Sequence, residues 1–209
     1  MGRKSSTKNG FFQSSIADFL KKLGSESASP GGGSAAALMA ATGVSLVEMV
    51  ARINEKRMQK KTHQKTPGAK LRIDSLVETR RRLIALIKLD MQAFEKLSRF
   101  SKEQRSESSY EEALRTATEP PFEMAQLTYE AMMLGEAEIG RTSRWLASDL
   151  AEAGIILEAS FQSAQLNVGI NLKSIQDSEF VGRIKGKLGQ LENKISASKM
   201  RLLEVLQHD

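Results

Sequence analysis

The sequence has no cysteine and only two histidines, His63 and His208. Without cysteine the chain can form no disulfide, no thiolate metal site and no thiol nucleophile. The two histidines are far apart and lie in polar stretches, so we expect neither a metal centre nor a Ser-His triad. Any chemistry is therefore expected to use other polar side chains, with no metal.

Proline and aromatic residues are also scarce. There are four prolines, and aromatic residues make up 5% of the 209 positions. Alanine, leucine, methionine, lysine and glutamate are abundant and β-branched runs are few, which favours helices. A chain of this length can bury a sizeable core. The composition predicts an all-α protein.

Long apolar runs are missing as well, because charged residues interrupt every candidate within a few turns. We therefore expect no membrane-spanning segment. The N-terminus lacks the apolar core of a signal peptide, so we expect a cytoplasmic protein. The net charge of +6 and a pI near 9.5 suit an anionic ligand or nucleic acid.

Apolar residues recur at helical spacing through most of the chain. Residues 1–13 are polar and basic and are expected to form a mobile tail, followed by a single helical domain over residues 14–209. Pro120 and Pro121 are expected to interrupt the fourth helical region, since proline breaks the helical hydrogen-bond ladder. We predict a bundle of about six helices, over residues 15–23, 34–58, 66–103, 111–139, 148–175 and 178–206.

Three consecutive glycines, Gly31, Gly32 and Gly33, precede Ser34 and an alanine-rich run. Each glycine costs a helix roughly 1 kcal/mol against alanine, which predicts a loop that leads into a helix. The free N–H groups at such a helix start could bind an anion or a carbonyl oxygen. The alternative is a tight turn that serves only close helix packing.

Asp90 lies on the apolar stripe of the third helical region, between Ile87 and Phe94. An unpaired carboxylate is costly to bury, so Asp90 must have a partner or a function. Desolvation would raise its pKa and suit it to proton transfer. The alternative is a structural ion pair with an inward-facing arginine or lysine.

Three further polar positions and one basic stretch are candidates for binding. Asp149 is near the start of the apolar fifth helical region, and Asn167 and Asn171 share one face near its end. The two amides could be hydrogen-bonding groups of the core or could bind a heteroaromatic ligand. Residues 52–72 contain eight Lys or Arg and one acid, which suits either a solvated surface or a binding strip for carboxylates or phosphates.

The ordered set of motifs resembles the cyclodeaminase and methenyltetrahydrofolate cyclohydrolase family, whose helical domain is fused to formiminotransferase in some animals. The resemblance runs from about residue 14 to residue 185. Its motifs are residues 16–23, 30–38, 48–52, 89–94, 117–125, 147–149 and 166–177.

This resemblance implies a homodimeric helical bundle with folate bound in a cleft beside the glycine segment. It implies a tetrahydrofolate derivative as substrate, with or without a polyglutamate tail, and no cofactor beyond tetrahydrofolate itself. Asp90 would be the general acid/base. Gly31, Gly32, Gly33, Ser34, Lys56, Asp149, Asn167 and Asn171 would bind the substrate. Cyclodeaminase and cyclohydrolase activity remain equally open.

The sequence departs from the family pattern at Arg144, Trp145 and Gly169. These positions motivate the alternative of a catalytically silent member that binds folate or a protein. A nucleic-acid-binding bundle would explain the basic stretch, but residues 52–72 contain no aromatic residue to stack on bases. A plain helical scaffold would leave Asp90 without a function.

Overall fold

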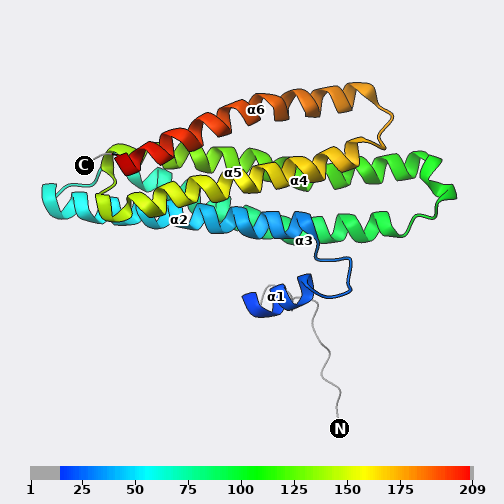
Figure 1. Ribbon diagram of the computed structural model, residues 1–209, viewed down its shortest axis with the longest axis horizontal. Coiled ribbons are helices and arrows are strands. Elements are labelled where there is room, and N and C mark those ends of the chain that lie inside the picture. Colours follow the sequence, from blue (N-terminus) through cyan, green and yellow to red (C-terminus); the bar gives the residue numbers. More distant parts are fainter. Residues whose placement is uncertain (1–14, 208–209) are drawn as a thin grey trace, which may run out of the picture.

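The computed structural model describes residues 15–207, and these form a bundle of long helices without any strand (Figure 1). The predicted all-α bundle of about six helices is confirmed. The predicted tail, residues 1–13, lies outside the described residues. The helices are α1 (Ile16–Leu23), α2 (Gly32–Thr62), α3 (Ala69–Ser98), α4 (Ser108–Glu136), α5 (Arg144–Leu172) and α6 (Ser178–Glu204), with short 3-10 helices η2 (Glu103–Ser106), η3 (Ile139–Arg141) and η4 (Val205–Gln207).

Helix α2 lies at the centre of the bundle and packs against α3, α4 and α5. Its small side chains allow this close approach: Ala36, Ala37 and Ala40 are completely buried or nearly so. A Cβ added at Gly43 would lie 2.8 Å from Cγ of Leu157 on α5. Gly32 faces Asn167 while Gly43 faces Leu157, so α2 and α5 run antiparallel.

Helix α4 runs without a break through Pro120 and Pro121, so the predicted interruption is wrong. Pro121 has no N–H to donate to the carbonyl of Ala117, which a helix would normally pair. The side-chain amide of Asn171 on α5 donates to that carbonyl instead, at 2.9 Å. A contact between distant parts of the chain thus compensates one of the two missing backbone bonds.

The limits and faces of two other helices differ from expectation. Helix α3 begins at Ala69 and ends at Ser98, five residues before the predicted end. Helix α5 is apolar almost all round in sequence but is not buried on every side, since Ile155, Leu166 and Ile170 are exposed. These three residues share one face, which the described part of the chain leaves uncovered.

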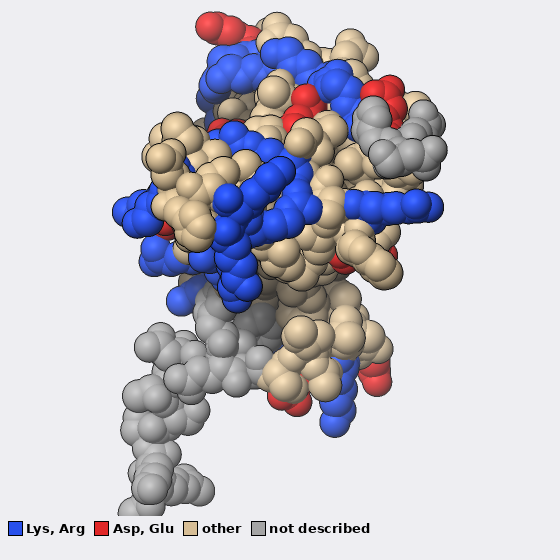
Figure 2. All heavy atoms as spheres, turned by 90° about the vertical axis from the view of Figure 1, so that its left-hand side faces the viewer, with Lys and Arg blue, Asp and Glu red and all other residues tan. Residues whose placement is uncertain are grey.

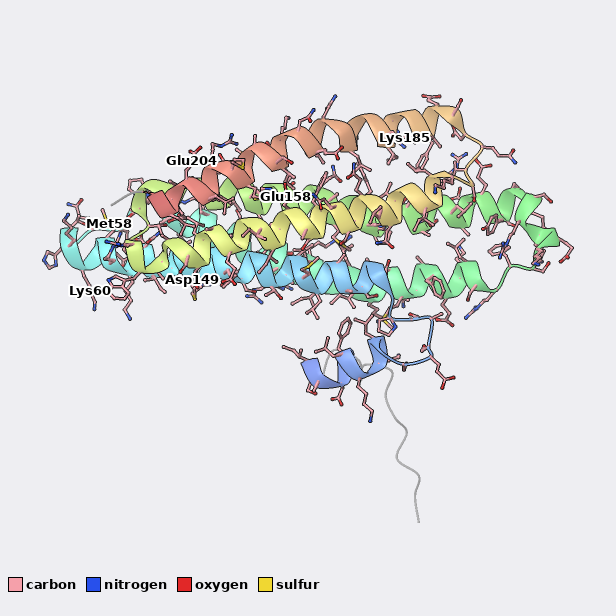
Figure 3. All side chains as sticks on the ribbon, viewed as in Figure 1. Met58, Lys60, Asp149, Glu158, Lys185 and Glu204 are labelled. Atoms are coloured by element: carbon pink, nitrogen blue, oxygen red, sulfur yellow. The ribbon has the colours of Figure 1, made fainter. Side chains whose placement is uncertain are left out.

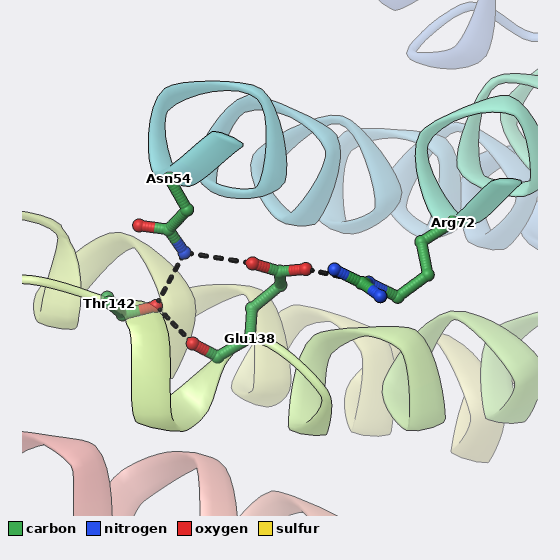
Figure 4. Close-up of polar contacts among 4 residues, drawn as sticks. All are labelled: Asn54, Arg72, Glu138 and Thr142. Carbon is green, nitrogen blue, oxygen red and sulfur yellow. Dashed lines mark hydrogen bonds and ion pairs between the residues drawn. The ribbon is translucent and has the colours of Figure 1, made fainter. Parts of the chain in front are cut away.

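The helix ends opposite the glycine segment are joined by a buried polar network (Figure 4). Glu138, only 2% exposed, accepts from Nδ2 of Asn54 at 3.0 Å and from Nε of Arg72 at 3.0 Å. Thr142 accepts from the same amide of Asn54 and donates to the carbonyl of Glu138. The network ties α2, α3 and the α4–α5 connection together at the basic end of the molecule, where Figure 2 shows Lys and Arg side chains gathered.

Among the described residues one helix, α2, is long and apolar enough by length and composition to cross a membrane. The expectation that no such run exists is wrong by this measure. Charged residues are confined to the second half of α2, so its first half is uninterrupted. Most of the apolar stretch is buried inside the bundle, as expected for the core helix that α2 is.

Candidate active site

A cavity of about 640 Å³ lies where the start of α2, the second half of α3, the first half of α4 and the end of α5 meet. It brings together six of the predicted site residues: Gly31, Gly32, Gly33, Asp90, Asn167 and Asn171. Apolar and polar side chains share the wall. The remaining lining residues are Ala28, Ser29, Ala93, Phe94, Leu97, Ser98, Arg105, Tyr110, Leu114, Ala117, Pro121, Ile170 and Ser174.

Asp90 caps the N-terminus of α2 from the neighbouring helix α3. The hydroxyl of Ser34 donates to Oδ2 of Asp90 at 2.9 Å, and the backbone N–H of Ser34 also bonds to this carboxylate. Gly31, the N-cap residue of α2, has no side chain to fill this role. Ser34 is at the third helical position, whose N–H a capping group normally binds. The capping carboxylate is therefore supplied through the tertiary fold.

The glycine segment explains how the carboxylate comes so close. A Cβ added at Gly33 would lie 2.2 Å from Oδ1 of Asp90, which is closer than nonbonded atoms can approach. Gly32 and Gly33 form the first turn of α2, so the prediction of a loop through all three glycines is wrong. First-turn N–H groups have no partner within their helix, and here Asp90 supplies one.

Burial raises the pKa of Asp90 above its ordinary value of 3.8, and the hydrogen bonds from Ser34 only partly offset this effect. Asp90 makes no ion pair within residues 15–207. The alternative of a structural ion pair with Asp90 is therefore wrong. Arg80 also lies on the apolar stripe of α3, ten positions before Asp90, and it pairs with Glu48 at 2.9 Å.

Asn167 and Asn171 lie on the cavity wall, and each donates its amide to a main-chain carbonyl. Asn167 bonds to Ser163 at 2.8 Å, one turn earlier on α5, and Asn171 bonds to Ala117 on α4. These bonds fix the orientation of both side chains. The interpretation of Asn171 as a structural hydrogen-bonding group is confirmed, and its place on the wall also suits ligand binding.

Lys56 and Asp149 are not brought to this cavity within one chain. Lys56 follows Gly33 by 23 positions of one continuous helix, which corresponds to roughly 35 Å. Asp149 precedes Asn167 by 18 positions on α5, or roughly 27 Å. Figure 3 shows Asp149 toward the same end of the bundle as Met58 and Lys60.

Sequence reasoning missed several residues of the wall. Arg105 on η2 is the one cation among the lining residues in the described part of the chain, and Phe94, Tyr110 and Ile170 supply apolar surface. Arg105 lies in a polar stretch between helices, where no periodicity could assign it to a site. Ile170 is 63% exposed, which the apolar pattern of α5 did not indicate.

The positions that depart from the family pattern leave the cavity open. Trp145 is 91% exposed and does not line the cavity. A Cβ added at Gly169 would have no other heavy atom within 4 Å, apart from its own local backbone. Neither position blocks access to Asp90 within the chain.

The fold and the cavity define a class of all-helical proteins in which a carboxylate from one helix caps another inside a ligand-sized cleft. Residues 15–190 match the family model described as formiminotransferase-cyclodeaminase, and the chain belongs to this family.

Relatives agree with this assignment. Methenyltetrahydrofolate cyclohydrolase of Methylorubrum extorquens is 29% identical over 91% of this chain and 95% of its own length. Formimidoyltransferase-cyclodeaminase of Rattus norvegicus is 30% identical over 90% of this chain, which spans only 36% of that longer protein. The crystal structure of formiminotetrahydrofolate cyclodeaminase from Thermotoga maritima superposes with a TM-score of 0.85 at 27% identity, covering 94% of this chain and 97% of the other.

Proposed function

We propose that this protein is a folate one-carbon enzyme that acts at methenyltetrahydrofolate, as a cyclohydrolase or as a formiminotetrahydrofolate cyclodeaminase. The observation that carries the proposal is the half-buried Asp90 carboxylate on the wall of a cavity of about 640 Å³. The family and the activities of the named relatives support the substrate class. The raised pKa supports a function in proton transfer.

In the cyclohydrolase reaction, water adds to the carbon that bridges the two nitrogens of the methenyl group. Asp90 accepts a proton from the attacking water as the carbon–oxygen bond forms. It then returns the proton to the ring nitrogen as the carbon–nitrogen bond breaks, and the added hydroxyl releases its own proton to solvent as the carbonyl of the formyl compound forms. The free N–H groups at the start of α2 would hold the developing oxygen.

The cyclodeaminase reaction closes the methenyl ring, whereas the cyclohydrolase reaction opens it. The second folate nitrogen attacks the carbon of the protonated formimino group and loses its proton to Asp90. The carboxyl group then protonates the departing nitrogen, and ammonia leaves as the methenyl ring closes. Both reactions require proton transfer but no change of oxidation state. We therefore propose that tetrahydrofolate is the only carrier required.

The residues that line the cavity suggest how the substrate is bound. Gly32 lets the substrate approach the backbone closely, whereas Gly33 makes room for Asp90. Asn167 and Asn171 present fixed amides to the edges of the pterin ring. Arg105 is placed to attract a carboxylate of the glutamate tail. The open position of Trp145 and the open cleft beside Asp90 argue against the catalytically silent alternative.

We also propose that the protein is a homodimer. The exposed apolar residues Ile155, Leu166 and Ile170 of α5 lie next to α2, whose outer face carries Thr42, Ser45 and Met49. A second copy would cover this surface, since dimers bury self-complementary patches around a two-fold axis.

The experiment follows the near-ultraviolet absorbance of methenyltetrahydrofolate at neutral pH with the wild type and with Asp90→Asn. We expect enzyme-dependent loss of absorbance, reduced about 10²–10⁴-fold by the substitution. If methenyltetrahydrofolate is stable, formiminotetrahydrofolate is tested next for methenyl formation and ammonia release. Inactivity with both compounds would refute the proposed function.

A further inference from the structure

Ser34 is the residue that attaches Asp90 to α2. Its side chain is completely buried. It is also not among the residues that line the cavity. Both of its hydrogen-bond donors are used on Asp90, because the hydroxyl donates to Oδ2 at 2.9 Å and the backbone N–H bonds to the same carboxylate. Ser34 therefore has no donor left to offer a substrate.

The two carboxylate oxygens of Asp90 have different surroundings. Oδ2 accepts the hydroxyl of Ser34, whereas no side chain of residues 15–207 donates to Oδ1. Oδ1 lies instead against the backbone of Gly33, at the point where any other residue would place its Cβ. A proton can therefore be exchanged at Oδ1 without breaking the bond from the Ser34 hydroxyl.

Few other ionisable groups face Asp90. Arg105 on η2 and Tyr110 on α4 are the other titratable residues of the cavity wall within the described part of the chain. Residues 32–47 of α2 and 159–172 of α5 carry no charged side chain. The nearest charged residues in the segment before α2, in α3 and in the first half of α4 do not line the cavity: Glu26, Lys88, Glu95, Lys96, Glu111, Glu112, Arg115 and Glu119. The hydrogen bonds from Ser34 are therefore the main contacts that favour the charged form of Asp90.

We propose that Ser34 is a positioning residue that fixes Asp90 through Oδ2 and leaves Oδ1 to exchange the proton with the substrate. This inference rests on the proposed folate function. It gives Ser34 an effect on catalysis through Asp90 and no contact with the folate. Gly33 and Ser34 then have complementary functions, since the glycine lets the carboxylate approach and the serine holds it there.

The hydroxyl of Ser34 should also affect the pH at which Asp90 ionises. A hydrogen bond to a carboxylate favours the charged form and lowers its pKa. Removing the hydroxyl leaves desolvation less opposed, which raises the pKa of Asp90 further. Asp90 must be ionised to accept a proton in either reaction. The acidic limb of the pH profile of kcat/KM should therefore move to higher pH in Ser34→Ala.

Steady-state kinetics of the wild type and Ser34→Ala from acidic to neutral pH test this inference, with the uncatalysed rate subtracted at each pH. We expect the acidic limb of kcat/KM to shift upward by about one pH unit, the scale of one charge-assisted hydrogen bond. KM should change less than about twofold, because a group that does not touch the substrate contributes no ground-state binding. An unshifted limb, or a raised KM with unchanged kcat, would overturn the inference. If Ser34→Ala does not fold, Ser34→Cys replaces it, and its weaker donor should shift the limb in the same direction.

Two further variants separate this effect from a general loss of structure. Ser160→Ala is the matched control, since Ser160 is also completely buried but donates its hydroxyl to the carbonyl of Ile156 in its own helix, at 2.7 Å. Its pH profile should equal that of the wild type. In an Asp90→Asn background, Ser34→Ala should lower kcat no further, because effects that act through one group are not additive. A further loss in that background would mean that Ser34 acts independently of Asp90 and would overturn the inference.

Urea denaturation tests the link between the two residues without measuring activity. The loss of stability caused by Ser34→Ala should grow as Asp90 ionises with rising pH, because hydrogen bonds to charged groups are the stronger ones. In the Asp90→Asn background the loss should not depend on pH. A loss that is independent of pH in both backgrounds would overturn the link. A wild type inactive on both folates would instead refute the proposed function and leave the stability result standing.

Discussion

Asp90 combines two properties that rarely occur in one carboxylate. It caps the start of α2 through Ser34, as a helix-capping residue does, yet burial raises its pKa. A capping carboxylate is normally stabilised in its charged form by the N–H groups and the helix dipole. Here desolvation outweighs that stabilisation, which leaves the carboxylate more basic than usual and still fixed in position.

Gly33→Ala should inactivate the enzyme while leaving the bundle folded. The added methyl group would lie 2.2 Å from Oδ1 of Asp90, so the carboxylate must move away from Ser34. A displacement of about 1 Å in a catalytic group can cost about 10²-fold in rate, and we expect a loss in kcat of this order. The measurement is steady-state kinetics alongside circular dichroism.

Gly169→Ala is the matched control for this prediction. It makes the same chemical change on another helix, where a Cβ meets no other heavy atom within 4 Å. Its activity should equal that of the wild type. If both variants keep full activity, the close contact between Gly33 and Asp90 is not needed for catalysis.

The stability difference between Asp90→Asn and the wild type should depend on pH. The folded-state pKa of Asp90 is raised above the ordinary value of 3.8, so the unfolded chain loses this proton first as the pH rises. The contribution of Asp90 to stability is therefore complete below about pH 3.8 and declines until the folded-state pKa is passed.

Asparagine does not titrate, so the melting temperature of Asp90→Asn relative to the wild type should rise from pH 4 upward and then level off. Differential scanning calorimetry of both proteins across this range is the measurement. A relative melting temperature that falls with rising pH would mean that hydrogen bonding outweighs desolvation at Asp90.

At the scale of the elements, the double proline of α4 and the second asparagine of α5 form one structural unit. Pro121 cannot pair with the carbonyl of Ala117, and Asn171 does so from the adjacent helix. The contact also fixes Asn171 on the cavity wall beside Ala117 and Pro121. A helix defect that would otherwise destabilise α4 thereby positions a side chain of the site.

Asn171→Ala should destabilise the protein by about 1–3 kcal/mol, because it leaves the carbonyl of Ala117 without a partner. In a Pro121→Ala background the same substitution should cost less, since alanine restores the backbone N–H. A double-mutant cycle by urea denaturation should give a coupling free energy of at least about 0.5 kcal/mol. Strictly additive effects would mean that the amide does not substitute for the missing backbone bond.

The helices around the cavity also show which features could be predicted from the sequence and which could not. The polar exceptions on apolar stripes correctly placed Asp90, Asn167 and Asn171 on one cavity, since a buried polar group needs a partner or a function. The continuity of α4 could not be predicted, because it depends on a hydrogen bond between residues 54 positions apart. Arg105 lies in a segment without periodicity, where tertiary packing alone determines its position.

At the scale of the whole molecule, charge and apolar surface are distributed unevenly. Lys and Arg side chains gather over the α2–α3 end seen in Figure 2, where residues 52–72 contain eight Lys or Arg and one acid. The face of α2 and α5 is comparatively poor in charge between its two ends. A basic end, a neutral middle and a ligand cavity therefore follow one another along a single face.

Ile155→Glu should convert the proposed dimer into monomers. Ile155 is 52% exposed near the middle of the α2–α5 face, where a two-fold axis would bring two introduced carboxylates together. Charged groups buried without partners in an interface cost several kcal/mol, enough to raise the dissociation constant by about 10²-fold or more. Light scattering coupled to size-exclusion chromatography at micromolar concentration measures the mass.

Met200→Glu is the matched control, because Met200 is 55% exposed on α6, away from this face. It should leave the mass of the wild type unchanged, and both variants should keep the helical signal of the native protein. If Ile155→Glu remains a dimer while Met200→Glu dissociates, the subunits meet through α6 and not through the face of α2 and α5. If the wild type is itself a monomer at this concentration, the proposed homodimer is wrong.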